Sequence, residues 1–199
     1  TLFRSSKGYT CDFSNMKNAE ELLNKVSSDF SNITLLINSA ANFIQENIEN
    51  TNSQHLLETI HINLLSPFIL MREYKKKFNQ GMIVNILDER ILRNVPTFAA
   101  YSVSKVGLAH LTRIASIEWG IEVRVNGIAP GLILPPVGQD NRYLKKESKH
   151  VPTGNHGSPE NLIKGLDYLL ENTFVNGEIL FIDGGESLNP GYTFSQRPQ

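Results

Sequence analysis

Tyr101 and Lys105 are the residues whose types and spacing most directly suggest chemistry in this sequence. They stand four residues apart in a segment with a helical pattern of apolar residues, so their side chains should share one helix face. An ammonium that close favours the phenolate, and we expect it to lower the pKa of Tyr101 from its usual value of about 10. Such a tyrosine can act as an acid near neutral pH. Because Tyr-x-x-x-Lys pairs also arise by chance on exposed helices, the surrounding residues must decide what this pair means.

Asp88 lies thirteen residues before Tyr101, directly after the apolar run Met82–Leu87. A run of that kind predicts a strand that is buried on both faces, and Ile33–Asn38 has the same character. Ligands of open α/β sheets bind at the carboxyl ends of the strands, which is where Asp88 is expected. The structural alternative is that Asp88 only caps the loop that follows its strand.

The elements that must position these residues alternate along the chain between short apolar runs and longer helical patterns. Strands are predicted at 33–38, 82–87, 123–128 and 178–182, and helices at 17–29, 52–78, 100–119 and 158–172. This alternation predicts an α/β fold, a doubly wound parallel sheet of the Rossmann-like type. Pro67 should bend or break the second helix.

The chain of 199 residues, 1–199, is long enough for a single domain with a full hydrophobic core. Its segment 131–157 is rich in glycine, proline and charged residues and has little periodicity. We expect this segment to form a mobile flap beside a site rather than a linker between domains.

The composition argues against several classes of partner. The net charge is −1 and no long apolar run occurs, so we expect no nucleic acid and no membrane as partner. The single cysteine, Cys11, and the scattered histidines offer no metal-ligand spacing, so no metal is expected. A reducing, cytoplasmic location is the simplest expectation.

Several further motifs, taken with Tyr101 and Lys105, resemble the short-chain dehydrogenase/reductase family in order and spacing. The resemblance runs from about Asp12 to Gly185, nearly the whole chain. The motifs that carry it are Cys11-Asp-Phe-Ser14, Ile37-Asn-Ser-Ala40, Asn63 before Pro67-Phe68, Tyr101…Lys105, Val123-Arg-Val-Asn-Gly-Ile-Ala-Pro-Gly131 and Phe181-Ile-Asp-Gly-Gly185.

The resemblance implies an enzyme that transfers hydride between a nicotinamide cofactor and a substrate. It implies that Tyr101 donates the proton, that Lys105 holds the nicotinamide ribose and tunes the tyrosine, and that Asn63 supports a water relay. The other residues implied to contact the cofactor are Asp12, Phe13, Asn38, Ser39, Ala40, Pro130, Gly131 and Leu132.

The chain departs from the family pattern at its start, where the Gly-rich turn Thr-Gly-x-x-x-Gly-x-Gly is not found. In the family that turn and the helix after it hold the pyrophosphate. We expect that the sequence omits this part, the alternative being a protein that has lost its phosphate cradle. Residues 1–6 are expected to end the second strand of the family fold. Arg4 and Ser5 would there suit a 2′-phosphate, so NADP(H) is expected rather than NAD(H), unless Arg4 is only a solvated surface charge.

A second departure concerns Asp88, because most family members have a serine at this position. The pteridine reductases and the dihydromonapterin reductases have an aspartate there. Phe43 falls where those enzymes stack the pterin against the nicotinamide. Reduction of a dihydropterin C=N bond requires a proton at nitrogen, which a carboxyl group can help to deliver. We therefore expect Phe43, Asp88 and Tyr101 to bind and reduce a pteridine-like substrate.

Two alternatives remain open from the sequence. The chain could be a carbonyl reductase, acting for example on a 3-oxoacyl thioester or a sugar, or a non-catalytic oligomeric remnant. Phe43 could simply fill the core or an interface. Both long helices, 52–78 and 100–119, have wider apolar faces than one sheet requires. In the family these helices form the subunit contacts, so a homotetramer is expected.

Overall fold

Four parallel strands form the centre of the fold in the computed structural model, which describes residues 6–189 and 191. The strands are β1 (Leu35–Asn38), β2 (Gly81–Ile86), β3 (Val123–Pro130) and β4 (Ile179–Ile182). They pair in the order β1-β2-β3-β4, and every pairing is parallel. The predicted α/β fold with a parallel sheet is confirmed, and the four strands fall where the apolar runs predicted them.

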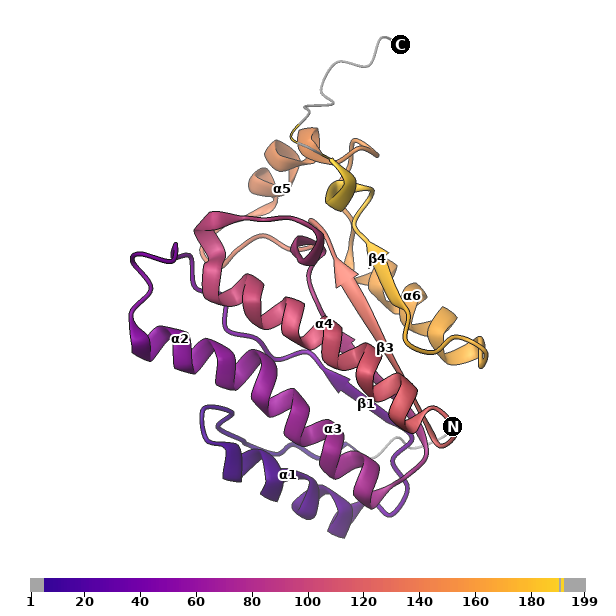
Figure 1. Cartoon of the computed structure of the whole chain (residues 1–199). Coiled ribbons are helices and arrows are strands. Elements are labelled where there is room, and N and C mark those ends of the chain that lie inside the picture. The colour runs from indigo at the N-terminus through magenta and orange to yellow at the C-terminus, as the bar shows by residue number, and fades with distance from the viewer. Residues whose placement is uncertain (1–5, 190, 192–199) are drawn as a thin grey trace.

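Helices cover both faces of this sheet (Figure 1). They are α1 (Met16–Asp29), α2 (Ser53–Ile60), α3 (Ser66–Lys77), α4 (Ala99–Trp119), α5 (Asn141–Glu147) and α6 (Pro159–Glu171). One apolar cluster joins α1, α3 and α4 to Ile83 and Val125. A second joins Leu169 of α6 to Met82 and Val84 on the other face. The alternating side chains of β2 therefore meet helices on both sides, as the doubly wound arrangement requires.

Burial differs between the central strands and β1. In β2 the side chains of Met82, Ile83 and Val84 are buried on both faces, as predicted. In β1 the expectation of full burial is wrong, because Leu35 and Leu36 are only half-buried and Ile37 is 42% exposed. Among the described residues β1 pairs with one strand only, so it lies at an edge of the sheet and has fewer neighbours.

The helix predicted over 52–78 continues past Pro67, but one turn in its middle is not α-helical. Between α2 and α3 the chain forms a π-helical turn, η1 (His61–Leu65), in which the N–H of Ser66 donates to the carbonyl of His61. Pro67 follows this turn and has no N–H to offer the carbonyl of Asn63, four residues before it. A π turn accommodates such a proline without ending the helix, and π turns occur frequently at functional sites.

The segment 131–157 contains a helix that its sequence pattern did not predict. Asp140 caps this helix, α5, by accepting a hydrogen bond from the N–H of Arg142 (2.8 Å). Leu144 and Val151 are buried, so the segment is anchored to the rest of the fold at two points. The mobility of the segment stays a prediction.

Gly81 begins β2 with a φ of +90°, and a Cβ placed there would lie 2.1 Å from the carbonyl oxygen of Thr34. We predict that Gly81→Ala lowers the free energy of unfolding by more than about 2 kcal/mol, because strain and a backbone clash add together. Gly138→Ala is the control, since Gly138 has a φ of +83° but open space around it. Urea unfolding of both variants gives the comparison, and equal losses would contradict the proposed clash with the carbonyl of Thr34, the residue just before β1.

Candidate active site

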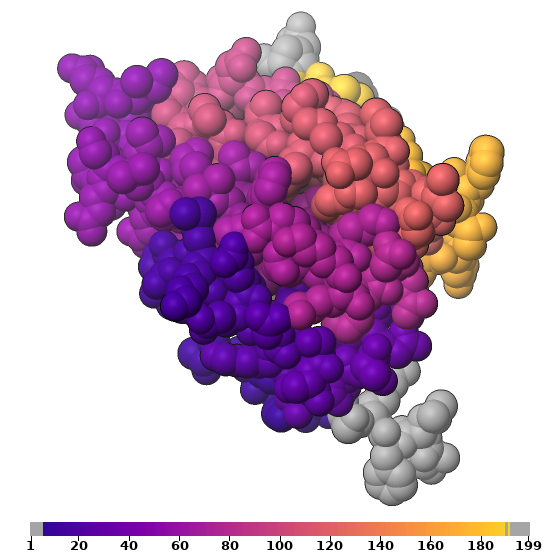
Figure 2. Space-filling view, turned by 60° about the horizontal axis from the view of Figure 1, so that its bottom comes forward, coloured from indigo at the N-terminus to yellow at the C-terminus, as the bar shows by residue number. Residues whose placement is uncertain are grey.

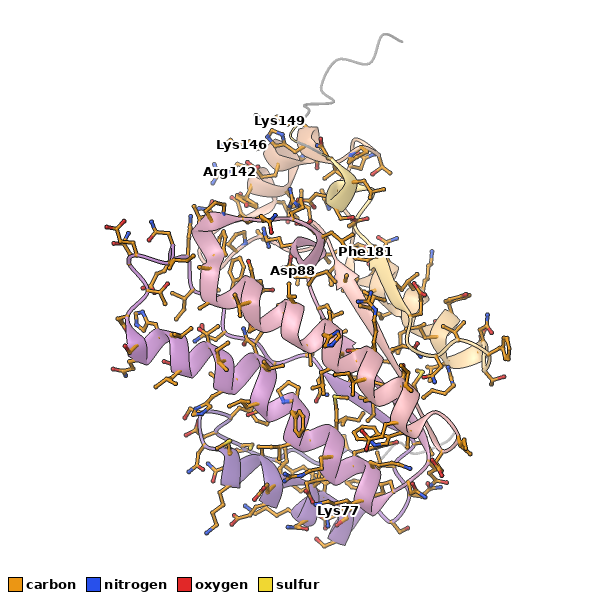
Figure 3. The ribbon with its side chains drawn as sticks, in the orientation of Figure 1. Lys77, Asp88, Arg142, Lys146, Lys149 and Phe181 are labelled. Atoms are coloured by element: carbon orange, nitrogen blue, oxygen red, sulfur yellow. The ribbon has the colours of Figure 1, made fainter. Side chains whose placement is uncertain are left out.

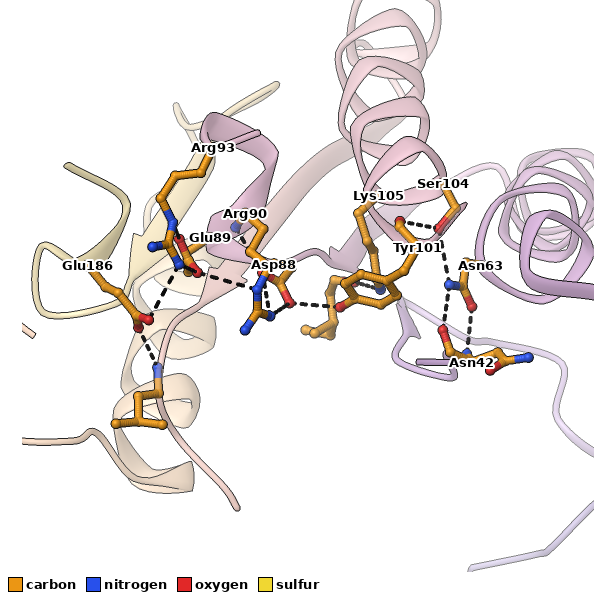
Figure 4. A network of polar contacts seen from close by, with 12 residues as sticks. Asn42, Asn63, Asp88, Glu89, Arg90, Arg93, Tyr101, Ser104, Lys105 and Glu186 are labelled. Atoms are coloured by element: carbon orange, nitrogen blue, oxygen red, sulfur yellow. Dashed lines mark hydrogen bonds and ion pairs between the residues drawn. The ribbon is translucent and has the colours of Figure 1, made fainter. Parts of the chain in front are cut away.

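Three segments bring the predicted chemical residues together at the carboxyl end of β2. Asp88 lies two residues after the end of that strand, Tyr101 and Lys105 lie on α4, and Asn63 lies in the π turn. Figure 3 shows Asp88 toward the end of the molecule that carries α5, far from Lys77 at the end of α3. The network that connects these residues is drawn in Figure 4.

The Tyr101 hydroxyl donates a hydrogen bond to Asp88 Oδ2 at 2.8 Å. The other oxygen of the same carboxylate, Oδ1, accepts the backbone N–H of Arg90 at 2.8 Å, and the Arg90 guanidinium lies 3.0 Å from Oδ2. Asp88 therefore does both jobs that its sequence position allowed: it caps the turn after its strand, and it contacts the tyrosine. Its side chain is only 12% exposed.

The expected lowering of the Tyr101 pKa by Lys105 is wrong for the free protein. Burial raises the pKa of Tyr101, and the negative charge of Asp88 and its hydrogen bond raise it further. The Lys105 ammonium lies 5.7 Å from the centre of the Tyr101 ring and donates instead to the carbonyl oxygen of Ile86 (2.8 Å). Spacing along the helix placed the two side chains together correctly, but it could not show that a carboxylate also reaches the phenol.

Lys105 itself is almost fully buried, with 3% of its surface exposed. Burial lowers the pKa of Lys105 from 10.5 to about 8, although the charge of Asp88 opposes the shift. A lysine of this kind changes its charge close to physiological pH and can respond to a negative charge that develops beside it.

Asn63 is completely buried and ties the π turn to two neighbouring segments. Its Oδ1 accepts the N–H of Asn42 (2.7 Å), and its Nδ2 donates to the Asn42 carbonyl (2.8 Å) and to Ser104 Oγ (3.1 Å). These bonds fix the loop after β1 against α4, and thereby fix the position of Phe43. The role of Asn63 in a water relay stays a prediction.

Phe43 belongs to an aromatic group that includes the tyrosine. Its ring stacks on Phe98 with centroids 4.6 Å apart and meets Tyr101 edge to face at 4.7 Å. The Arg90 guanidinium carbon lies 5.5 Å from the Phe43 centroid and 5.2 Å from that of Phe98. Phe43 keeps 46% of its surface exposed, so this group has a face open to a ligand.

A second group of charges extends from Asp88 to the end of β3. Glu89 is buried and forms an ion pair with Arg93, which lies 3.5 Å from Glu186. Burial raises the pKa of Glu89 to about 7, although the hydrogen bond from Arg93 opposes the shift. Glu186 in turn accepts the backbone N–H of Leu132 at 3.0 Å. The chain after β4 is thus linked through charges to the chain after β2.

Four of the residues predicted to contact the cofactor line one cavity of about 240 Å³, at the carboxyl end of β1: Phe13, Asn38, Ser39 and Ala40. Ser66 donates to the carbonyl of Phe13 (2.8 Å) and so holds this wall in place. Asp12 is exposed and is not among the lining residues; its carboxylate accepts the N–H and the hydroxyl of Ser14, which lowers the pKa of Asp12.

Pro130 ends β3, and Gly131 continues the sheet by donating its N–H to the carbonyl of Ile182 (3.1 Å). A Cβ on Gly131 would lie 2.7 Å from the backbone of Asp183, so glycine allows the two strand ends to approach closely. Leu132 follows beside Glu186. Arg4 and Ser5 lie outside the residues that the structure describes.

Sequence reasoning missed several residues of this site, above all Arg90, Phe98 and Glu186. Arg90 had a readable signal, because an arginine two residues after a turn-capping aspartate can reach its carboxylate. Glu186 had none, since its contact with Arg93 depends on the pairing of both β2 and β4 with β3. Within residues 6–189 and 191 no group of three His, Cys, Asp or Glu side chains could hold a metal ion. No helix in that part of the chain could span a membrane.

Comparisons with known proteins agree with this geometry. The family model described as "Enoyl-(Acyl carrier protein) reductase" matches residues 3–187. The chain belongs to the short-chain dehydrogenase/reductase family. It is therefore an NAD(P)-dependent oxidoreductase, and the parallel sheet is the family's fold.

Relatives within the short-chain dehydrogenase/reductase family have diverse names. A 2-dehydro-3-deoxy-D-gluconate 5-dehydrogenase of Pseudoalteromonas atlantica is 31% identical over 198 residues, covering 92% of this chain and 76% of that protein. A 3-oxoacyl-(acyl-carrier-protein) reductase of Bos taurus is 29% identical over 184 residues, covering 90% and 77%. FolM alternative dihydrofolate reductase 1 from Brucella canis, solved with NADP, superposes with a TM-score of 0.81 at 26% identity, covering 89% of this chain and 71% of that one.

The buried Lys105 yields a test by pH. The folded pKa of about 8 lies below the ordinary value of 10.5, so between these values the unfolded chain binds more protons and stability rises with pH. At pH 7 the free energy of unfolding of Lys105→Met should exceed that of the wild type by up to about 3 kcal/mol. This advantage should shrink as the pH rises toward 10.

The comparison uses denaturant unfolding at several pH values, with Lys76→Met as the control. Lys76 is 61% exposed, so its replacement should change stability little across the range. If the difference in free energy of unfolding between wild type and Lys105→Met does not change with pH, burial of the Lys105 amine carries no desolvation penalty.

Proposed function

We propose that the protein uses NADPH to reduce a pteridine at a C=N bond of the dihydropterin type. The observation that carries the proposal is the hydrogen bond between the Tyr101 hydroxyl and Asp88. A carboxylate stands here where, by the family resemblance, most members use a serine hydroxyl to hold a substrate carbonyl. Reduction at C=N needs a proton at nitrogen, and this pair joins a proton donor to a proton acceptor.

The cofactor, when bound, supplies the hydride that enters the substrate carbon. Phe13 and the segment 38–40 would hold its adenosine side, and Lys105 its nicotinamide ribose. The segment 130–132 would lie beside the nicotinamide. Arg4 and Ser5 would contact a 2′-phosphate, which is the basis for preferring NADP(H) over NAD(H). The cavity beside Phe13 is consistent with such a ligand, being lined by apolar side chains with a few polar groups.

The route of the proton to the substrate can be inferred from the charges around Tyr101. Its raised pKa keeps the proton on the phenol in the free protein. Loss of that proton would leave two negative oxygens about 2.8 Å apart, so the proton given by Tyr101 to the substrate nitrogen must be replaced. Asp88, which is 12% exposed, would take this replacement proton from water and pass it to the phenolate, which restores both side chains. The two side chains thereby act as one relay, and the Lys105 ammonium stabilises negative charge on the phenol.

The FolM dihydrofolate reductase supports this choice, because a protein named for reducing a related heterocycle has the same fold. A carbonyl reductase is the second candidate, favoured by the relatives named for 3-oxoacyl and sugar-acid substrates. Oxidation of NADPH in the presence of dihydrobiopterin, a 3-oxoacyl thioester or simple ketones distinguishes the two. Turnover of the carbonyl compounds alone would refute the pteridine proposal.

Replacement of Asp88 gives a sharper test. We expect Asp88→Ser to lower kcat/KM for a dihydropterin by at least about 100-fold, because the relay loses the carboxylate that accepts the Tyr101 hydrogen bond. Ketone turnover should fall much less. Asp140→Ser is the matched control, since Asp140 also accepts the N–H of an arginine two residues later and pairs with its guanidinium. A rise in both activities of Asp88→Ser would show that Asp88 is not adapted to pterins.

We also propose that the protein is a homotetramer assembled through 52–78 and 100–119. Figure 2 shows the magenta surface of α3 beside the salmon surface of α4. These helices expose large apolar side chains that a lone subunit would leave in water: Leu57, Phe68, Val103, Val106, Ile114 and Ile117. Large apolar side chains exposed together on helices that pack against one another are typical of a protein contact.

Ile117 tests the proposed assembly because 86% of its surface is exposed on α4. Ile117→Asp should give a smaller particle by light scattering after size-exclusion chromatography, since a charge at a subunit contact is costly. Ile163→Asp is the control, because Ile163 is exposed on α6, which covers the other face of the sheet. A wild-type monomer would refute the tetramer.

A further inference from the structure

We propose that Arg90 contacts the substrate and determines specificity, selecting a planar heterocycle that presents a hydrogen-bond donor and an acceptor on one edge. This inference rests on the proposed function and refines it. Arg90 lies in the 3-10 turn Glu89–Leu92, two residues after Asp88. The residue is not part of the Tyr101, Lys105 and Asn63 set that the family resemblance implies.

The guanidinium of Arg90 is held in one plane by three partners. Nη1 lies 3.3 Å and 3.0 Å from the two oxygens of Asp88, and the group lies against Phe43 and Phe98. Ion pairing and contact with two aromatic rings both restrict a flat cation, so its position is defined before any ligand binds. Figure 4 shows this guanidinium beside Asp88.

Part of the guanidinium is left available to a ligand. The Arg90 side chain is 27% exposed, and its second terminal nitrogen, Nη2, has no hydrogen bond or ion pair to any other described residue. A ligand ring resting on the open surface of Phe43, within reach of the Tyr101 hydroxyl, would lie beside this nitrogen. Nη2 is therefore a hydrogen-bond donor at the same wall of the site as the acceptor Asp88.

Adjacent donor and acceptor groups discriminate strongly between ligands. The amino-oxo edge of a pterin carries N–H groups that Asp88 can accept and an oxygen to which Arg90 can donate. A simple ketone offers one acceptor and no donor, so it could bond Arg90 or Tyr101 but would add no donor to the Asp88 carboxylate. Sites built to bond a polar group reject ligands that lack it far more strongly than apolar pockets reject a misfit.

Lysine at position 90 would keep the positive charge but could not provide the flat, forked donor that lies against two rings. We therefore expect Arg90→Lys to weaken dihydrobiopterin use by roughly 10- to 100-fold in kcat/KM, mainly through a higher KM. Affinity for NADPH and turnover of ketones should stay within about threefold of wild type.

The experiment also measures by calorimetry how tightly oxidised biopterin binds to the full chain with NADP⁺. No reduction occurs in this titration, because NADP⁺ carries no hydride. Arg142→Lys is the matched control, because Arg142 donates to Asp140 two residues before it, as Arg90 does to Asp88, but lies over no aromatic ring of the residues that the structure describes. We expect biopterin to bind at least about tenfold more weakly to Arg90→Lys and with unchanged affinity to Arg142→Lys.

The outcomes separate this inference from the proposed function. If dihydrobiopterin is reduced but Arg90→Lys binds biopterin as the wild type does, the inference fails and the function stands. If Arg90→Lys loses equal amounts of kcat for pterin and ketone and binds biopterin with unchanged affinity, Arg90 only supports Asp88. That result also overturns the inference. Biopterin binding that depends on Arg90 without turnover would refute the function alone, and no biopterin binding to the wild type would refute both.

Discussion

The Asp88 carboxylate is the group on which the rest of this site depends, because three donor groups from two residues converge on it. It accepts the hydroxyl of Tyr101, the backbone N–H of Arg90 and the guanidinium of the same arginine. Each bond has a separate effect: one fixes the phenol, one ends β2 in a defined turn, and one orients a cation against the aromatic rings. A serine could not satisfy all three donors, since it has one oxygen and no charge.

The same carboxylate explains why the free site differs from a simple tyrosine and lysine pair. Burial alone makes a phenolate or an ammonium unfavourable, and it shifts the pKa of Tyr101 upward and that of Lys105 downward. Asp88 opposes the shift at Lys105 and adds to the shift at Tyr101. A free protein with a neutral phenol and a lysine near its titration point is thus prepared to move one proton when a ligand arrives.

Much of this arrangement could be predicted from the sequence, because its determinants are local. Apolar runs located the strands, and a four-residue spacing placed Tyr101 beside Lys105. The direction of the Tyr101 pKa shift could not be predicted, since it depends on how deeply the ring is buried and on which charge touches its oxygen. Arg93 follows β2 and Glu186 follows β4, so they meet only because both strands pair with β3, an arrangement that local patterns do not encode. The helix α5 was missed because a short, capped helix has too few turns to show a periodicity.

The π turn at His61–Leu65 has a consequence for how this helix can vary. Such a turn contains one residue more than an α-helical turn, and each residue of an α-helix rotates the chain by about 100°. The extra residue therefore sets the rotational phase of α3 relative to α2. Deletion of a single residue there would join α2 and α3 into one continuous α-helix, and it would turn Asn63 away from Asn42 and Ser104. The number of residues between α2 and α3 therefore determines whether Asn63 faces its partners, Asn42 and Ser104.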